Sequence, residues 1–126
     1  SQDLMVKFMR ENKREAALAP YVHPFHPFSL QPSSYGEISA RLESIEQVSA
    51  RVAEVEPDGK GVPILLKHYL KLNATLLEFN VDPGFANCLD ALVLIDLHRT
   101  PDRLLGRYMG RSALRKFREE SAAAVK

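Results

Sequence analysis

The chain has a single cysteine and no long apolar run. Because Cys88 stands alone, an internal disulfide is excluded, and one free thiol is typical of a reducing compartment. The longest uncharged apolar runs cover about six residues, around residues 92–95, whereas a membrane-spanning helix needs about 20. These observations predict a cytoplasmic protein.

The composition is that of a globular domain. The 126 residues are 45% hydrophobic and 26% charged, which predicts one folded domain over residues 1–126 with no internal repeat. The net charge of +1 conceals two opposed segments. Six acids and two arginines between residues 37 and 58 give a local balance of −4, and seven Lys/Arg against Asp102 between residues 98 and 118 give +6. The near-neutral total and the absence of a recognition motif argue against nucleic-acid binding.

Helices dominate the first half of the predicted structure. Apolar spacing predicts a helix over residues 3–18, which Pro20 would end. Four prolines then favour an extended course over residues 20–33. Ser34 and Glu37 have the spacing of a capping box, and the apolar stripe that follows predicts a long helix over residues 34–55.

The second half alternates helices and strands. Pro63 suits the first turn of a helix that begins near Val62. Strands are predicted over residues 74–81 and, as a buried run, over residues 91–97, with a polar loop between them. Thr100 and Pro101 should cap a short helix that ends at Met109, and Ser112 would cap a last one. The predicted fold class is α/β, with helices packed on an antiparallel strand pair.

Gly59, Lys60 and Gly61 form the first candidate site. They precede a helix, whose free amides and dipole favour an anion, and Lys60 adds a full positive charge. An acyl donor's phosphate or pantetheine is the candidate ligand. A plain turn, in which glycine supplies unusual backbone angles, accounts for the same residues.

Three polar residues mark the second candidate site, at and after the loop between the strands. Asn80 and Asp82 lie where the first strand ends, and Asp96 lies within the second predicted strand. A carboxylate at a strand end can act as a general base or hold an amine substrate. A charge inside an apolar strand is expected to be paired or functional. An ordinary turn around Asp82 and an exposed strand end at Asp96 are the structural alternatives.

A set of arginines in the last third of the chain suggests a docking surface. Five arginines recur every four residues, beginning at Arg99, and the docking candidates are the last four: Arg103, Arg107, Arg111 and Arg115. Their charge favours an acidic partner protein or anionic lipid head groups. A solvated, salt-bridged surface is the other interpretation.

No catalytic residue or metal site can be identified from spacing. His23 and His26 are three residues apart, but the prolines around them exclude a helix, and no cysteine or carboxylate completes a ligand set. The chain shows no Ser-His-Asp or Cys-His arrangement that would indicate a nucleophile.

Several segments resemble one known family. Residues 57–72 (PDGKGVPILLKHYLKL), 79–85 (FNVDPGF), 89–97 (LDALVLIDL) and 107–110 (RYMG) are similar to the C-terminal part of the hemolysin-like N-acyltransferases. These are relatives of the GNAT acetyltransferases and include the ornithine-lipid N-acyltransferases. Residues 1–10 resemble the helix that follows the central strand of that family.

The resemblance implies an activity for which this chain would supply one part. The family transfers a long acyl chain from acyl carrier protein or CoA, as co-substrate, to an amine in bacterial lipid synthesis. No bound cofactor is implied. The family's donor-binding turn would lie before residue 1, so this chain would be the C-terminal part of a larger acyltransferase domain. Acyl carrier protein is the partner that the resemblance implies. The arginines also favour an anionic membrane surface at the inner face, and the exposed edges of a two-stranded sheet predict a dimer with a second copy of the chain. The alternative is a non-catalytic interaction or oligomerisation module.

Overall fold

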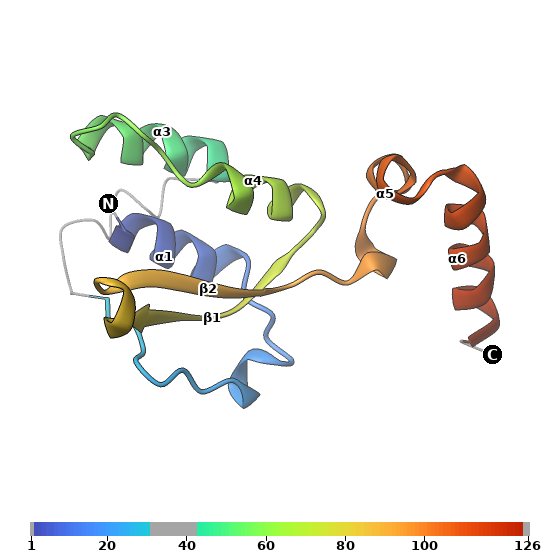
Figure 1. Cartoon of the computed structure of the whole chain (residues 1–126), viewed down its shortest axis with the longest axis horizontal. Coiled ribbons are helices and arrows are strands. Elements are labelled where there is room, and N and C mark those ends of the chain that lie inside the picture. Colours follow the sequence, from blue (N-terminus) through green and yellow to red (C-terminus); the bar gives the residue numbers. More distant parts are fainter. Residues whose placement is uncertain (1, 31–42, 125–126) are drawn as a thin grey trace.

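The computed structural model describes residues 2–30 and 43–124 and shows an α/β arrangement (Figure 1). The helices of these ranges are α1 (Gln2–Asn12), α3 (Ile45–Val55), α4 (Ile64–Lys71), α5 (Asp102–Met109) and α6 (Arg111–Ala124). The strands are β1 (Thr75–Asp82) and β2 (Cys88–Leu94), which pair in antiparallel fashion. Short 3-10 turns lie at Ala19–Tyr21, Pro83–Phe85 and Leu97–Arg99. The predicted α/β class with an antiparallel strand pair is confirmed at this level.

The core forms around α1, which packs on α3 and on β1. Because α1 packs against both elements, more than one of its faces is buried. Val6, Phe8 and Met9 are at most 1% exposed. α3 contributes Val48 and β1 contributes Phe79, both almost fully buried. Burial of such side chains is the main favourable term in folding. α1 therefore joins α3 to the strand pair.

A bulge in β1 changes which residues face this core. The register shifts between Leu76 and Glu78, so one extra residue stands in β1. Side chains alternate across a strand, and an extra residue reverses that alternation. Leu76 and Phe79, three positions apart, are therefore both buried.

The first helix is shorter than predicted. α1 ends at Asn12 instead of near Leu18, because the next residues pair with β1. The Leu76 amide donates to the Lys13 carbonyl at 2.6 Å, and the Glu15 amide donates to the Leu76 carbonyl at 2.8 Å. Further along β1, the Val81 amide donates to the His26 carbonyl at 2.8 Å. Two flanking segments thus cover parts of the outer edge of β1.

The long helix predicted over residues 34–55 is wrong at its start. Glu43 and Ser44 are not helical, and α3 begins at Ile45. The Ser44 hydroxyl accepts from the Gln47 amide at 3.2 Å, and the Gln47 side chain accepts from the Glu43 amide at 2.7 Å. This is a capping-box type of exchange. The Ser34–Glu37 box lies outside the described residues.

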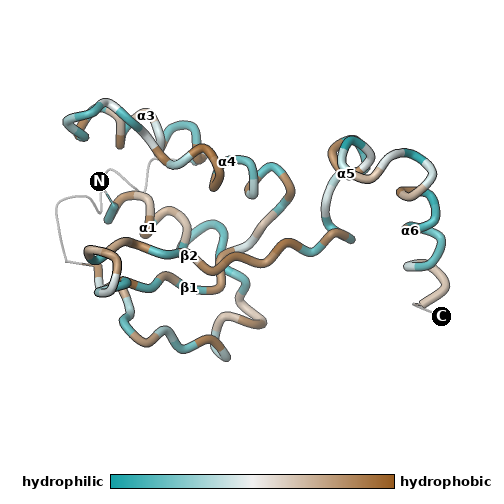
Figure 2. Tube along the Cα trace, viewed as in Figure 1, coloured by the Kyte–Doolittle hydropathy of each residue, from teal (hydrophilic) through white to brown (hydrophobic). Residues whose placement is uncertain are grey.

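The second strand also differs from its prediction. β2 begins at Cys88, three residues before the predicted residue 91, and ends at Leu94, so Ile95, Asp96 and Leu97 follow it. It is not a buried strand, since Ala91 and Leu92 are exposed and β1 is its sole paired neighbour among the described residues. Apolar residues continue from β2 into the segment before α5 (Figure 2).

The last two helices form an arm beside this body (Figure 1). α5 covers residues 102–109, as the sequence predicts, and Gly110 separates it from α6. Ser112 lies inside α6, so it is not the cap that the sequence suggested. α6 has no buried residue, and α5 buries only Leu105.

Candidate functional site

The turn before α4 is built from its two glycines and from Ser49 of α3. Gly59 has a φ of 71°, a left-handed value that glycine adopts without strain. The Lys60 amide donates to the Asp58 carboxylate at 2.9 Å, and the Val62 amide donates to the buried Ser49 hydroxyl at 3.0 Å. These two amides are therefore engaged within the protein. A candidate anion at this turn would depend on the Lys60 side chain and on the first amides of α4.

A pocket of about 340 Å³ opens beside this turn. Its wall combines one cation with two carboxylates, namely Lys60 with Glu56 and Asp58. Sequence reasoning did not assign Glu56 and Asp58 to a site. Glu56 directly follows α3 and Asp58 lies in the turn beside Lys60, and this closeness in sequence is the signal that could have found them. The mixture suits a ligand group that carries an ammonium as well as one that carries an anion.

A second, apolar pocket of about 310 Å³ adjoins the first and shares three residues with it: Met5, Pro63 and Leu89. α4 supplies one wall with Leu65, Leu66 and Tyr69, and β2 supplies the other, including Ala91 and Val93. We refer to these two neighbouring pockets together as the α4–β2 trough. It is polar at the Lys60 end and apolar along α4.

The three polar candidates near the strands do not converge on the trough. The Asn80 side chain accepts from the His26 amide at 2.8 Å, and the Asp82 carboxylate accepts from the Gly84 amide at 2.9 Å. Asp96 accepts from the His98 amide at 3.0 Å and lies 3.7 Å from Arg99. Asp82 and Asp96 thus fix local backbone, whereas Asn80 ties β1 to the distant residue His26. Asp90, which pairs in register with Asn80, is the carboxylate of this region that lines the trough.

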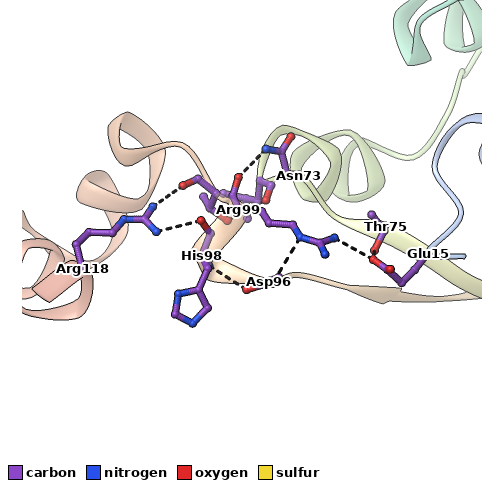
Figure 3. A network of polar contacts seen from close by, with 9 residues as sticks. Glu15, Asn73, Thr75, Asp96, His98, Arg99 and Arg118 are labelled. Atoms are coloured by element: carbon purple, nitrogen blue, oxygen red, sulfur yellow. Dashed lines mark hydrogen bonds and ion pairs between the residues drawn. The ribbon is translucent and has the colours of Figure 1, made fainter. Parts of the chain in front are cut away.

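A polar network joins the arm to the body (Figure 3). Arg99 pairs with Glu15 at 3.0 Å, and Glu15 also accepts from the Thr75 hydroxyl at 3.2 Å. On the other side, Arg118 of α6 donates to the carbonyls of His98 and Thr100, at 3.1 and 2.8 Å. The segment between β2 and α5 is thereby held from both directions.

The four arginines of the predicted docking surface fall into two pairs. Arg103 and Arg107 lie on α5 and line a pocket between α5 and α4. Arg111 and Arg115 are exposed on α6. The predicted basic surface is therefore divided between two helices, and its α5 pair lines a pocket.

The described residues contain no helix that could cross a bilayer, and no trio of His, Cys, Asp and Glu side chains placed around a metal. Comparison with known proteins adds no relative: no family model, no curated protein and no solved structure matches this chain.

Proposed function

We propose that the chain takes part in the transfer of a long acyl chain from acyl carrier protein or CoA to an amine, as the C-terminal part of a GNAT-like N-acyltransferase domain. The observation that carries this proposal is the α4–β2 trough. The resemblance of residues 57–72 and 89–97, described above, supports it, because these segments provide both walls of the trough.

The trough has the two surfaces that such a substrate pair needs. The apolar part, along Leu65, Leu66 and Val93, would take methylene groups out of water, and each buried CH2 contributes about 0.8 kcal/mol. The polar end places Lys60 and the carboxylates Glu56 and Asp58 beside the opening of that part. The volumes of about 340 and 310 Å³ are those of ordinary ligand sites, which begin at about 300 Å³.

The test is a calorimetric titration of the chain with palmitoyl-CoA, butyryl-CoA and free CoA. We expect the palmitoyl thioester to bind most tightly, because its chain fills the apolar part. Ala91→Trp, which places an indole in the trough, should abolish that preference for the long chain. Lys60→Ala should lower the affinity for palmitoyl-CoA and butyryl-CoA by a similar factor. Lys116→Ala, an exposed lysine on α6, is the matched control and should change nothing. Equal affinities for the three ligands would refute the proposal.

A second candidate function is assembly through the outer edge of β2. This strand carries one charged residue, Asp90, and neither proline nor lysine, the residues with which proteins commonly protect a strand edge. Its Leu92 is 53% exposed. A two-stranded sheet gains stability when a further strand is added, so we propose pairing with a second copy as the alternative role.

Light scattering after size exclusion separates the two candidates. Assembly through the edge predicts a concentration-dependent dimer that Leu92→Lys dissociates. Ile64→Lys, at another apolar and exposed position, on α4, should leave the dimer intact. A monomer at every concentration would exclude this candidate and leave the acyl-binding role untouched.

A further inference from the structure

A pocket between α4 and α5 collects positive charge without any acid in its wall. Its volume is about 440 Å³. The basic residues come from both helices: His68 and Lys71 from the last turns of α4, Arg103 and Arg107 from α5. The remaining wall is apolar or aromatic and consists of Leu72, Pro101, Leu104 and Tyr108.

The three full charges of this pocket have no counterion among residues 2–30 and 43–124. Neither Lys71, Arg103 nor Arg107 makes an ion pair there, in contrast to Arg99 and Arg118, which are both paired. The nearest acid in sequence, Asp102, is not part of the wall and lies 2.8 Å from Arg118. The positive charge is therefore available to a ligand.

Hydrogen bonds hold the two helices that carry these charges. The buried Thr100 hydroxyl donates to the Leu72 carbonyl at 2.9 Å, and the Asn73 amide group donates to the Arg99 carbonyl at 2.7 Å. The end of α4 is thereby tied to the residues directly before α5. The backbone of both walls is therefore fixed before a ligand enters, and the remaining ordering cost is that of the exposed basic side chains.

We infer that this pocket binds the phosphate of a phosphorylated ligand. A carboxylate is satisfied by one bidentate arginine, whereas a phosphate has the extra acceptor oxygens and the second negative charge to use Arg103, Arg107 and Lys71 together. Tyr108 and Leu104 offer a surface to the organic part of the ligand. The inference goes beyond the proposed function, since it uses none of the trough. Two sources carry this chemistry: a soluble phosphate ester and the head group of an anionic lipid.

The first experiment titrates inorganic pyrophosphate into the whole chain and into two double variants. Arg103→Ala with Arg107→Ala removes two charges from the pocket, and Arg111→Ala with Arg115→Ala removes two from the exposed face of α6. We expect the first pair to weaken binding by about tenfold or more, because charge-assisted hydrogen bonds are lost, and the second pair to change it less than about twofold. Lys71→Ala, on the opposite wall, should weaken binding as well. Circular dichroism verifies that each variant keeps its helices.

Equal weakening by the two double variants would show general charge attraction and overturn the inference, as would a failure of pyrophosphate to saturate. Co-sedimentation then identifies the source, with vesicles of phosphatidylcholine alone or mixed with phosphatidylglycerol. Binding to the anionic vesicles that is lost in Arg103→Ala with Arg107→Ala, and competed by pyrophosphate, assigns a lipid head group. Pyrophosphate binding with no vesicle binding assigns a soluble ester. Ala91→Trp tests the trough separately and should leave pyrophosphate binding unchanged.

Discussion

At Gly61 the turn before α4 passes so close to α3 that no side chain fits between them. A Cβ there would lie 2.5 Å from the Ser49 carbonyl oxygen and in contact with the Ser49 hydroxyl as well. The same hydroxyl accepts from the Val62 amide, so the turn cannot move away without losing a buried hydrogen bond. We therefore expect Gly61→Ala to lower the free energy of unfolding by about 1–3 kcal/mol, the usual cost of overpacking.

Urea denaturation measures this effect, and Gly106→Ala provides the comparison. Gly106 lies inside α5, where an added Cβ would come within ordinary contact of Leu114, at 3.4 Å. There alanine should stabilise the chain by about 0.5–1 kcal/mol through its helix propensity. A neutral Gly61→Ala would mean that the turn does not pack on Ser49.

The chemistry of single residues was easier to predict than their partners. The glycines at 59 and 61 were correctly expected to form a turn before a helix, but Ser49, twelve residues earlier than Gly61, could not be inferred as the group against which the turn packs. The partner of Asn80 was equally hard to predict, because its side chain accepts from the amide of His26, which is 54 residues away. Local pattern identifies a polar residue; only the folded chain shows whether it caps backbone or faces a cavity.

At the scale of single elements, the start of α3 is capped by Ser44, whose hydroxyl accepts from the Gln47 amide, while the Gln47 side chain accepts from the Glu43 amide just before the helix. An N-cap serine contributes about 1 kcal/mol relative to alanine. We expect Ser44→Ala to lower the free energy of unfolding by that amount, measured by thermal or urea denaturation. Ser112→Ala, inside α6, should remain within about 0.5 kcal/mol of the parent chain. Equal effects at the two positions would contradict this assignment of the cap.

The elements themselves were predicted to the extent that local pattern determines them. The helix at residues 102–109 and the strand that begins at Thr75 lie where apolar spacing and turn residues place them. The errors arose where pairing overrides the pattern. α1 stops at Asn12 because residues 13–15 join β1, and the bulge beside Leu77 reverses the faces of β1. Neither event leaves a signal within a short window of sequence, since both depend on a distant strand.

At the scale of the whole molecule, a body built on α1 is joined to an arm that has little core of its own (Figure 1). The arm relies on polar anchors instead of buried area: Thr100 and Asn73 hold its first residues, and Arg118 holds α6 (Figure 3). The phosphate pocket inferred above lies at this junction. Its geometry therefore depends on the anchors that fix the arm, and the trough, which lies within the body, does not share that dependence.

Arg118 is the anchor whose removal tests this division. Its guanidinium donates to the carbonyls of His98 and Thr100 and pairs with Asp102, while α6 has no fully buried residue and adds the stacking of Phe117 on His98. We expect Arg118→Ala to reduce the hydrogen-exchange protection of α6 amides strongly and that of α1 amides hardly at all, because local opening of the arm leaves the core intact. Arg115→Ala, exposed and unpaired within the described part of the chain, should preserve protection in both helices. Uniform loss of protection along the chain in Arg118→Ala would instead show that arm and body unfold as one unit, in which case the pocket and the trough could not respond independently to their ligands.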